Sequence, residues 1–190
     1  MSQRAKFLLL LTLFIVPTIA SFVVFYFFPP SKTSNYGTLV TPVVALPEIN
    51  LQRRDAGAEP MPAGLRGKWL LVTRDSGACE ATCQQKIYAM RQSRLILGRE
   101  QDRVLRVVLL DDDVRPTEQL QREFEGTIWL SAKDSALLRL LPAAAEDSSG
   151  RAAIYAVDTL GNLFMRYASD ADIKKLSNDL QRVLKASQIG

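Results

Sequence analysis

The sequence predicts an α/β domain, with a mixed sheet flanked by helices, that follows an N-terminal transmembrane helix. Three observations support this fold class. Residues 7–28 form an uncharged apolar run, short apolar runs alternate with helical patterns over residues 69–157, and an amphipathic pattern closes the chain. Strands separated by helices pair in parallel, so the centre of the sheet is expected to be parallel.

The apolar run of residues 7–28 is long enough to cross a membrane. A helix over these residues would span about 33 Å, against a hydrocarbon core of about 30 Å. A cleaved signal peptide is the alternative, but its apolar region is shorter and ends in small residues, whereas this run ends in FVVFYFF. Arg4 and Lys6 precede the run, which keeps the N-terminus in the cytoplasm. We therefore expect a single-pass anchor in a bacterial inner membrane and a periplasmic C-terminal domain.

After the anchor, the patterns predict a strand–helix order that ends in a hairpin and a last helix. The predicted strands are residues 69–73, 103–110, 127–130, 152–157 and 163–167, and the predicted helices are residues 82–97, 117–124 (with Thr117 as N-cap), 132–141 and 170–186. This is the order of a thioredoxin-like fold. It places a loop and a helix start directly after the first core strand, where α/β sheets present their sites.

The segment between the anchor and the first core strand is rich in Pro, Gly, Ser and Asn and has no helical period. Such a composition is typical of an extended linker, here with at most one short hairpin. The predicted division is a cytoplasmic N-terminus (1–6), the transmembrane anchor (7–28), a linker (29–45) and a thioredoxin-like domain (46–190).

Composition excludes several kinds of site. The chain contains no histidine, which excludes histidine general bases and metal sites that need an imidazole. The net charge of +4 is small, so we expect no nucleic-acid partner. Six basic residues could form a basic face, but they alternate with acids and we interpret them as a solvated face: Lys86, Arg91, Arg94, Arg99, Arg103 and Arg106.

Cys79 and Cys83 form a CxxxC motif and are the candidate site residues. Two cysteines at a loop–helix junction can form a short-range disulfide or present two thiolates to one metal ion. The helix N-terminus favours a thiolate, at Cys83 in particular, and we expect Cys79 to be the more exposed. A structural disulfide is the alternative, but so short a loop removes little chain entropy. We therefore interpret the pair as a redox or metal centre.

Several motifs resemble the Sco (SenC) family: Gly67-Lys68-Trp69, the CxxxC motif, and Tyr155-Ala156-Val157-Asp158 with Gly161. Members of that family are membrane-anchored, thioredoxin-like proteins that assist copper insertion into cytochrome c oxidase. The resemblance implies copper ligation by both cysteines and by a histidine at about Gly150, where this chain has none. It is similar to a divergent member, in which the two thiolates alone can hold Cu(I) and Cu(II) binding should be weak.

The resemblance implies an accessory factor for cytochrome c oxidase assembly. Cys79 and Cys83 would reduce a copper site on the oxidase copper-site subunit or carry Cu(I), so that any enzymatic activity would be that of a thiol–disulfide oxidoreductase. The alternatives are a Sco-like scaffold with a structural disulfide and a general periplasmic oxidoreductase. The general oxidoreductase is disfavoured because the motif is not CxxC and no proline directly precedes the strand at 152–157. Residues 111–113, three aspartates, are interpreted as a solvated turn.

Overall fold

The computed structural model describes residues 3–27, 35–47, 51–55, 65–143, 147 and 149–187. They fall into two units, residues 1–34 and residues 35–190. The first unit consists of α1 (Gln3–Phe27), whose mean hydropathy reaches 2.6 over a window with no buried residue. This helix is long and apolar enough to cross a membrane, a test that a signal sequence also passes. Pro17 lies inside it, as membrane helices tolerate.

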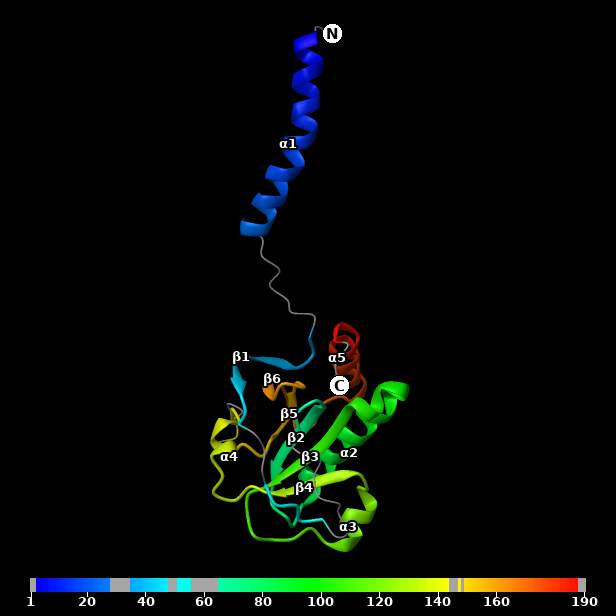
Figure 1. Cartoon of the computed structure of the whole chain (residues 1–190). Coiled ribbons are helices and arrows are strands. Elements are labelled where there is room, and N and C mark those ends of the chain that lie inside the picture. The colour runs from blue at the N-terminus through cyan, green and yellow to red at the C-terminus, as the bar shows by residue number, and fades with distance from the viewer. Residues whose placement is uncertain are drawn as a thin grey trace. The chain divides into compact units, whose positions relative to one another are not determined.

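The described residues of the second unit form a six-stranded sheet in the order β1-β6-β5-β2-β3-β4 (Figure 1). Neighbours β2, β3 and β4 pair in parallel, and β5, β6 and β1 add antiparallel strands on the other side of β2. The mixed sheet predicted from the sequence is therefore confirmed. The strands are β1 (Thr38–Ala45), β2 (Trp69–Asp75), β3 (Val104–Leu110), β4 (Thr127–Ser131), β5 (Ala153–Val157) and β6 (Asn162–Ala168).

Helices connect and cover these strands. Thr117 is the N-cap of its helix, as predicted, because its hydroxyl oxygen accepts a hydrogen bond from the Leu120 N–H at 3.2 Å. The helix predicted over residues 132–141 is shorter, because the Ala132 N–H still bonds to the sheet and Ser135 caps the helix three residues later. The helices are α2 (Ala81–Ile96), a 3₁₀ helix (Gly98–Arg103), α3 (Glu118–Glu123), α4 (Ala136–Leu140) and α5 (Ile173–Ala186).

The sheet buries both of its faces, because side chains alternate along each strand. On β2, Leu70 and Val72 pack with Leu137 of α4 on one face. Leu71 points to the opposite face and packs with α2 and with the apolar side of α5, including Leu176. Figure 1 shows α4 on one side of the sheet and α2 and α5 on the other. This arrangement leaves the C-terminal ends of β2 and β3 free to carry loops.

Residues 38–45 correct the predicted linker of residues 29–45. They form β1, which pairs with β6 in an antiparallel arrangement, while residues 29–34 lie outside the described residues. The backbone N–H groups of Tyr36 and Gly37 each donate to Asp179 on α5 at 2.9 Å. The sequence did not predict this strand because it lies at the sheet edge, is mostly exposed and contains Pro42. The other predicted boundaries of the domain division stay predictions.

Candidate functional site

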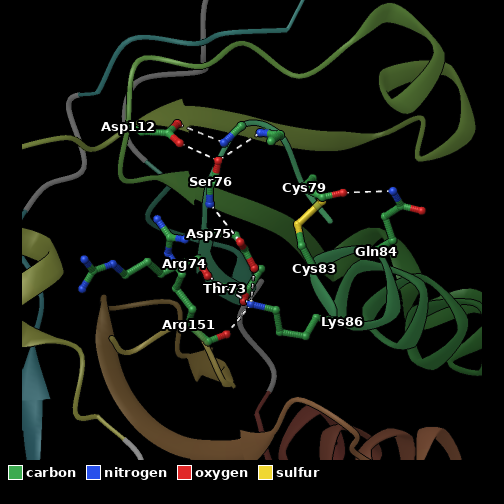
Figure 2. Close-up of a disulfide and its surroundings, with 12 residues drawn as sticks. Thr73, Arg74, Asp75, Ser76, Cys79, Cys83, Gln84, Lys86, Asp112 and Arg151 are labelled. Atoms are coloured by element: carbon green, nitrogen blue, oxygen red, sulfur yellow. Dashed lines mark hydrogen bonds and ion pairs between the residues drawn. A yellow bond between two sulfur atoms is a disulfide. The ribbon is translucent and has the colours of Figure 1, made fainter. Parts of the chain in front are cut away.

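The site is the junction between β2 and α2, where the two cysteines lie side by side (Figure 2). Cys79 belongs to the loop after β2, and Cys83 lies in the first turn of α2. Their sulfur atoms form a disulfide, with a Cα–Cα distance of 5.0 Å. The apolar β2 strand is followed by a Ser-Gly turn, and α2 begins four residues after that turn, at Ala81. The fold therefore brings both candidate residues into one bonded pair.

Both cysteines are buried. Cys79 is 0% exposed and Cys83 is 1% exposed. The prediction that Cys79 is the more exposed cysteine is therefore wrong. One side of the disulfide packs in an apolar cluster formed by helices α2 and α3 with strands β3 and β4, whose other members are Ile87, Val108, Leu110, Leu120, Phe124 and Trp129.

The turn that carries Cys79 is held from the neighbouring loop. Asp112 accepts hydrogen bonds from the Ser76 hydroxyl and from the Gly77 N–H, the latter at 3.0 Å. Gly77 lies against the backbone of Val114 so closely that a Cβ there would sit 1.8 Å from the Val114 oxygen. Cys79 itself has a left-handed backbone, with φ of 42°, which is uncommon for a residue other than glycine. These contacts fix Cys79 behind the loop that follows β3.

A solvent-open pocket of about 350 Å³ lies on the other side of the pair. Cys83 borders this pocket, whereas Cys79 is not among the described residues that line it. No described side chain caps the N-terminus of α2, so its first N–H groups remain available to negative charge. The pocket is lined by Asp75, Ser76, Ala78, Glu80, Thr82, Cys83, Asp147, Ser149, Arg151 and Ala152.

A buried ion pair lies beside the pocket, between Lys86 of α2 and Asp75 at the end of β2. The Lys86 side chain is 0% exposed, and its Nζ lies 2.7 Å from the Asp75 carboxylate. Nζ also donates to the carbonyl oxygens of Arg74 and Arg151, so three acceptors surround it (Figure 2). Burial lowers the pKa of Lys86, and the hydrogen bond and charge of Asp75 oppose that change. This contact ties α2 to the loop before β5.

The solvated basic face expected from the sequence is contradicted at two positions. Lys86 and Arg106 are both buried, and burial together with the charges of Arg94 and Arg91 lowers the pKa of Arg106 to about 10. Arg106 lies on β3 and donates to the carbonyl oxygen of Glu125. Alternation of charges along the sequence did not distinguish these two cations because burial depends on contacts with distant elements.

A second ionic cluster joins the ends of β2, β3 and the loop before β5. Asp111 accepts hydrogen bonds from Arg151 at 2.6 and 2.9 Å and from Arg74 at 2.8 Å. Burial opposes ionisation of Asp111, but the hydrogen bonds from the two arginines outweigh it and lower the pKa of this carboxyl. Its side chain is 3% exposed, so the interpretation of 111–113 as a solvated turn is wrong for Asp111. Asp112 does have a turn role, since it accepts the Val114 N–H.

The residues present do not match the donor set of a resident copper ion. Around the position where the resemblance places a histidine, the chain has Ser149, Gly150 and Arg151. The Arg151 guanidinium is engaged with Asp111. Among the described residues, no group of three or more His, Cys, Asp or Glu side chains is arranged to hold a metal. Among the described residues that line the pocket or form the disulfide, the only soft donors are therefore the two sulfur atoms.

Sequence reasoning missed the charged residues around the pair. A signal for Lys86 was available, because it lies three residues after Cys83 and immediately before Ile87, within the apolar face of the predicted helix. Arg151 and Asp111 carried no such signal, since forty positions separate them. The two residues meet only because the chain passes through β4 and α4 and then returns to the end of β3.

Comparison with known proteins supports this description of the fold. Residues 69–187 match the family model described as a transmembrane-like, thioredoxin-like, C-terminal domain. No curated protein shows significant sequence similarity to the chain.

Solved Sco structures share the fold. Apo Sco1 from Thermus thermophilus is 16% identical with a TM-score of 0.54, and the match covers 82% of this chain and 98% of that one. A SCO1/SenC family lipoprotein from Bacillus anthracis is 15% identical with a TM-score of 0.54, covering 75% and 98%. Yeast Sco1 with copper bound is 12% identical with a TM-score of 0.51, covering 65% and 82%. At these identities, the similarity establishes the thioredoxin-like fold.

Proposed function

Because the chain belongs to the family of transmembrane-like, thioredoxin-like C-terminal domains, we propose that it is a membrane-anchored, Sco-like accessory factor for cytochrome c oxidase assembly. Cys79 and Cys83 act as a thiol–disulfide reductant of the copper site on the oxidase copper-site subunit. The observation that carries this proposal is a bonded sulfur pair at the β2–α2 junction with a solvent-open pocket beside Cys83.

Reduction of a partner is favoured over copper transport by the donor set. A copper site made of cysteines must be in the thiol form before it can take up metal, and a dithiol can supply the two electrons required. The chain has no histidine, and Arg151, which is engaged by Asp111, follows directly after Gly150, near which the third ligand was expected. Transport of Cu(I) as cargo between the two thiolates is the second version, since soft thiolates suit Cu(I).

The transmembrane anchor determines the compartment in which this activity takes place. Residues 7–28 hold the chain in the bacterial inner membrane, with residues 1–6 in the cytoplasm and the domain in the periplasm. The length and hydropathy of α1 support this arrangement, and Arg4 and Lys6 support the orientation. Tethering keeps the domain close to a membrane-embedded partner and raises the effective concentration of the pair.

The burial of both cysteines favours a competing function. A Sco-like scaffold would keep the disulfide permanently as a structural cross-link and would bind its partner through other surfaces. The packing of the pair against an apolar cluster supports that alternative. A general periplasmic oxidoreductase ranks below both functions, because CxxxC replaces the usual CxxC.

Redox equilibration separates the reductant from the scaffold. The full chain in detergent micelles is equilibrated with thiol couples of known potential, and the oxidised fraction is measured by alkylation and mass. A reductant is expected to have a potential above about −300 mV, in the range of physiological couples, whereas a lower potential identifies a structural disulfide. The Cys83→Ser variant is the control that cannot form the pair.

Copper titration separates the reductant from the carrier. The reduced full chain is titrated anaerobically with Cu(I) and, in a second experiment, with Cu(II). A reductant without cargo is expected to bind neither ion tightly. Tight Cu(I) binding that disappears in Cys83→Ser would instead establish the carrier version.

A further inference from the structure

The two sulfur atoms of the disulfide have different surroundings. Cys83 borders the pocket of about 350 Å³, whereas Cys79 is not among the described residues that line it, and Gly77 of its turn lies against the backbone of Val114. In thiol–disulfide exchange the incoming sulfur must reach the sulfur to which it bonds, so access decides which of the two is attacked. The pocket gives that access on the Cys83 side.

We propose that Cys83 is the sulfur that bonds to the partner, in the pocket beside it, and that Cys79 is the internal sulfur that resolves the mixed disulfide. This inference rests on the proposed thiol–disulfide function and assigns the roles within it. The sequence left the two roles open and predicted only that Cys79 would be the more exposed residue.

The surroundings of Cys79 suit an internal sulfur. Its carbonyl oxygen accepts a hydrogen bond from the Gln84 side chain at 2.9 Å, and its N–H donates to Ser76 at 3.1 Å. These bonds, together with the Asp112 contacts, hold the turn in place when the sulfurs separate. The uncapped N-terminus of α2 lies next to Cys83 and favours the thiolate form of that sulfur.

The reaction proceeds in two exchanges. The Cys83 thiolate attacks the partner disulfide, a Cys83–partner S–S bond forms, and the first partner sulfur leaves as a thiolate. The Cys79 thiolate then attacks Cys83, the mixed disulfide breaks, and the second partner sulfur leaves. Two electrons pass to the partner, its thiolates take up two protons from water, and the protein ends with the Cys79–Cys83 bond. An exported dithiol reductant restores the reduced pair.

Single-cysteine variants test this assignment. The full chain in detergent micelles is prepared as Cys79→Ala, which leaves Cys83, and as Cys83→Ala, which leaves Cys79. Each is reacted with the neutral disulfide 4,4′-dithiodipyridine, and each rate is divided by that of the same variant unfolded in guanidinium. Cys83 is expected to react at least ten times faster than Cys79. Equal rates, or a faster Cys79, would overturn the assignment.

A second test leaves the disulfide intact. Thr82→Trp places a large side chain on the pocket lining, and Gln85→Trp places the same side chain at an exposed position of α2 that is not among the described lining residues. Dithiothreitol should reduce the Thr82→Trp protein at least five times more slowly than wild type and the Gln85→Trp protein at an unchanged rate. If Thr82→Trp is reduced as fast as wild type, access does not run through this pocket.

The two proposals fail in different ways. If physiological couples cannot reduce the pair, the proposed function fails, and the single-cysteine rates still rank the two sulfurs. If the pair is readily reduced but Cys79 reacts faster, only the assignment of roles fails.

Discussion

Lys86 is a cation without solvent exposure, and its environment explains why it can remain buried. Its three N–H groups meet the Asp75 carboxylate and the carbonyl oxygens of Arg74 and Arg151. A buried charge is tolerated when such acceptors replace water. The same contacts join the helix of Cys83 to the segment that borders the pocket, so Lys86 stabilises the shape of the site.

Replacing Lys86 should therefore destabilise the domain strongly. Lys86→Met removes the cation and leaves the Asp75 carboxylate buried without its partner, which is expected to lower the free energy of unfolding by about 3–5 kcal/mol. The double variant Asp75→Asn/Lys86→Met should recover part of that loss because no buried charge is left unpaired. Urea denaturation followed by tryptophan fluorescence measures both effects. Lys174→Met, an exposed position on α5, should change little, and an equally small effect for Lys86→Met would contradict this role.

Asp147 makes the pocket rim dependent on pH. Hydrogen bonds from the Ser149 hydroxyl and from the Ser149 and Ala152 N–H groups lower its pKa to about 2. Because the folded pKa lies below the unfolded value of about 3.9, the ionised carboxylate stabilises the folded state above pH 4. That contribution should be lost as the pH falls from about 4 to about 2.

The comparison of wild type with Asp147→Asn tests this expectation. The difference in unfolding free energy between the two proteins should be constant from pH 7 to about pH 4 and should shrink towards pH 2. Asp170→Asn, which removes an exposed carboxylate outside the loop, is the matched control. A difference that does not depend on pH would show that the hydrogen bonds of Asp147 do not depend on its charge.

The candidate pair could be located from the sequence because its determinants are local. A strand, a Ser-Gly turn and a helical pattern fix where Cys79 and Cys83 lie. Their burial could not be read in the same way. It depends on Phe124 and Trp129, which pack in the same cluster as the pair, and on Asp112, which lies 35 positions after Gly77 and reaches the turn through the pairing of β2 with β3.

At the scale of elements, β1 shows why the domain begins before the predicted boundary. The strand contributes few buried side chains, and its attachment comes from backbone pairing with β6 and from Asp179. Gly37 is required at this contact, because a Cβ would lie 2.5 Å from the Tyr167 ring. Core strands such as β2 can be predicted from their apolar runs. An edge strand that is held by backbone hydrogen bonds has no comparable pattern in the sequence.

Asp179 should therefore control the attachment of β1. Asp179→Ala leaves the N–H groups of Tyr36 and Gly37 without their acceptor, and we expect a loss of about 1.5–3 kcal/mol. Urea denaturation measures this loss, and limited proteolysis should cut the variant within residues 35–45 at lower protease concentration. Asn178→Ala, at the exposed position next to it on α5, should behave as wild type. Unchanged proteolysis of Asp179→Ala would mean that pairing with β6 alone holds the strand.

On the scale of the whole molecule, a reductant must keep its fold in both redox states. The two main apolar clusters lie on opposite faces of the sheet, and neither includes Cys79 or Cys83. The disulfide belongs to a smaller third cluster at one end. Most of the core therefore stays in place whether the two sulfurs are bonded or separate.

Reduction should weaken the domain without unfolding it. The disulfide closes a loop with a sequence separation of 4 residues, and such a short loop contributes about 2 kcal/mol through the entropy of the unfolded chain. We expect the reduced full chain in detergent to unfold in one cooperative urea transition, shifted by about that amount. Tryptophan fluorescence follows it, since Trp69 and Trp129 both lie in the domain. The variant Cys79→Ala/Cys83→Ala should not respond to reductant. Loss of the cooperative transition on reduction would identify the bond as a structural cross-link, because a domain that unfolds when reduced cannot cycle.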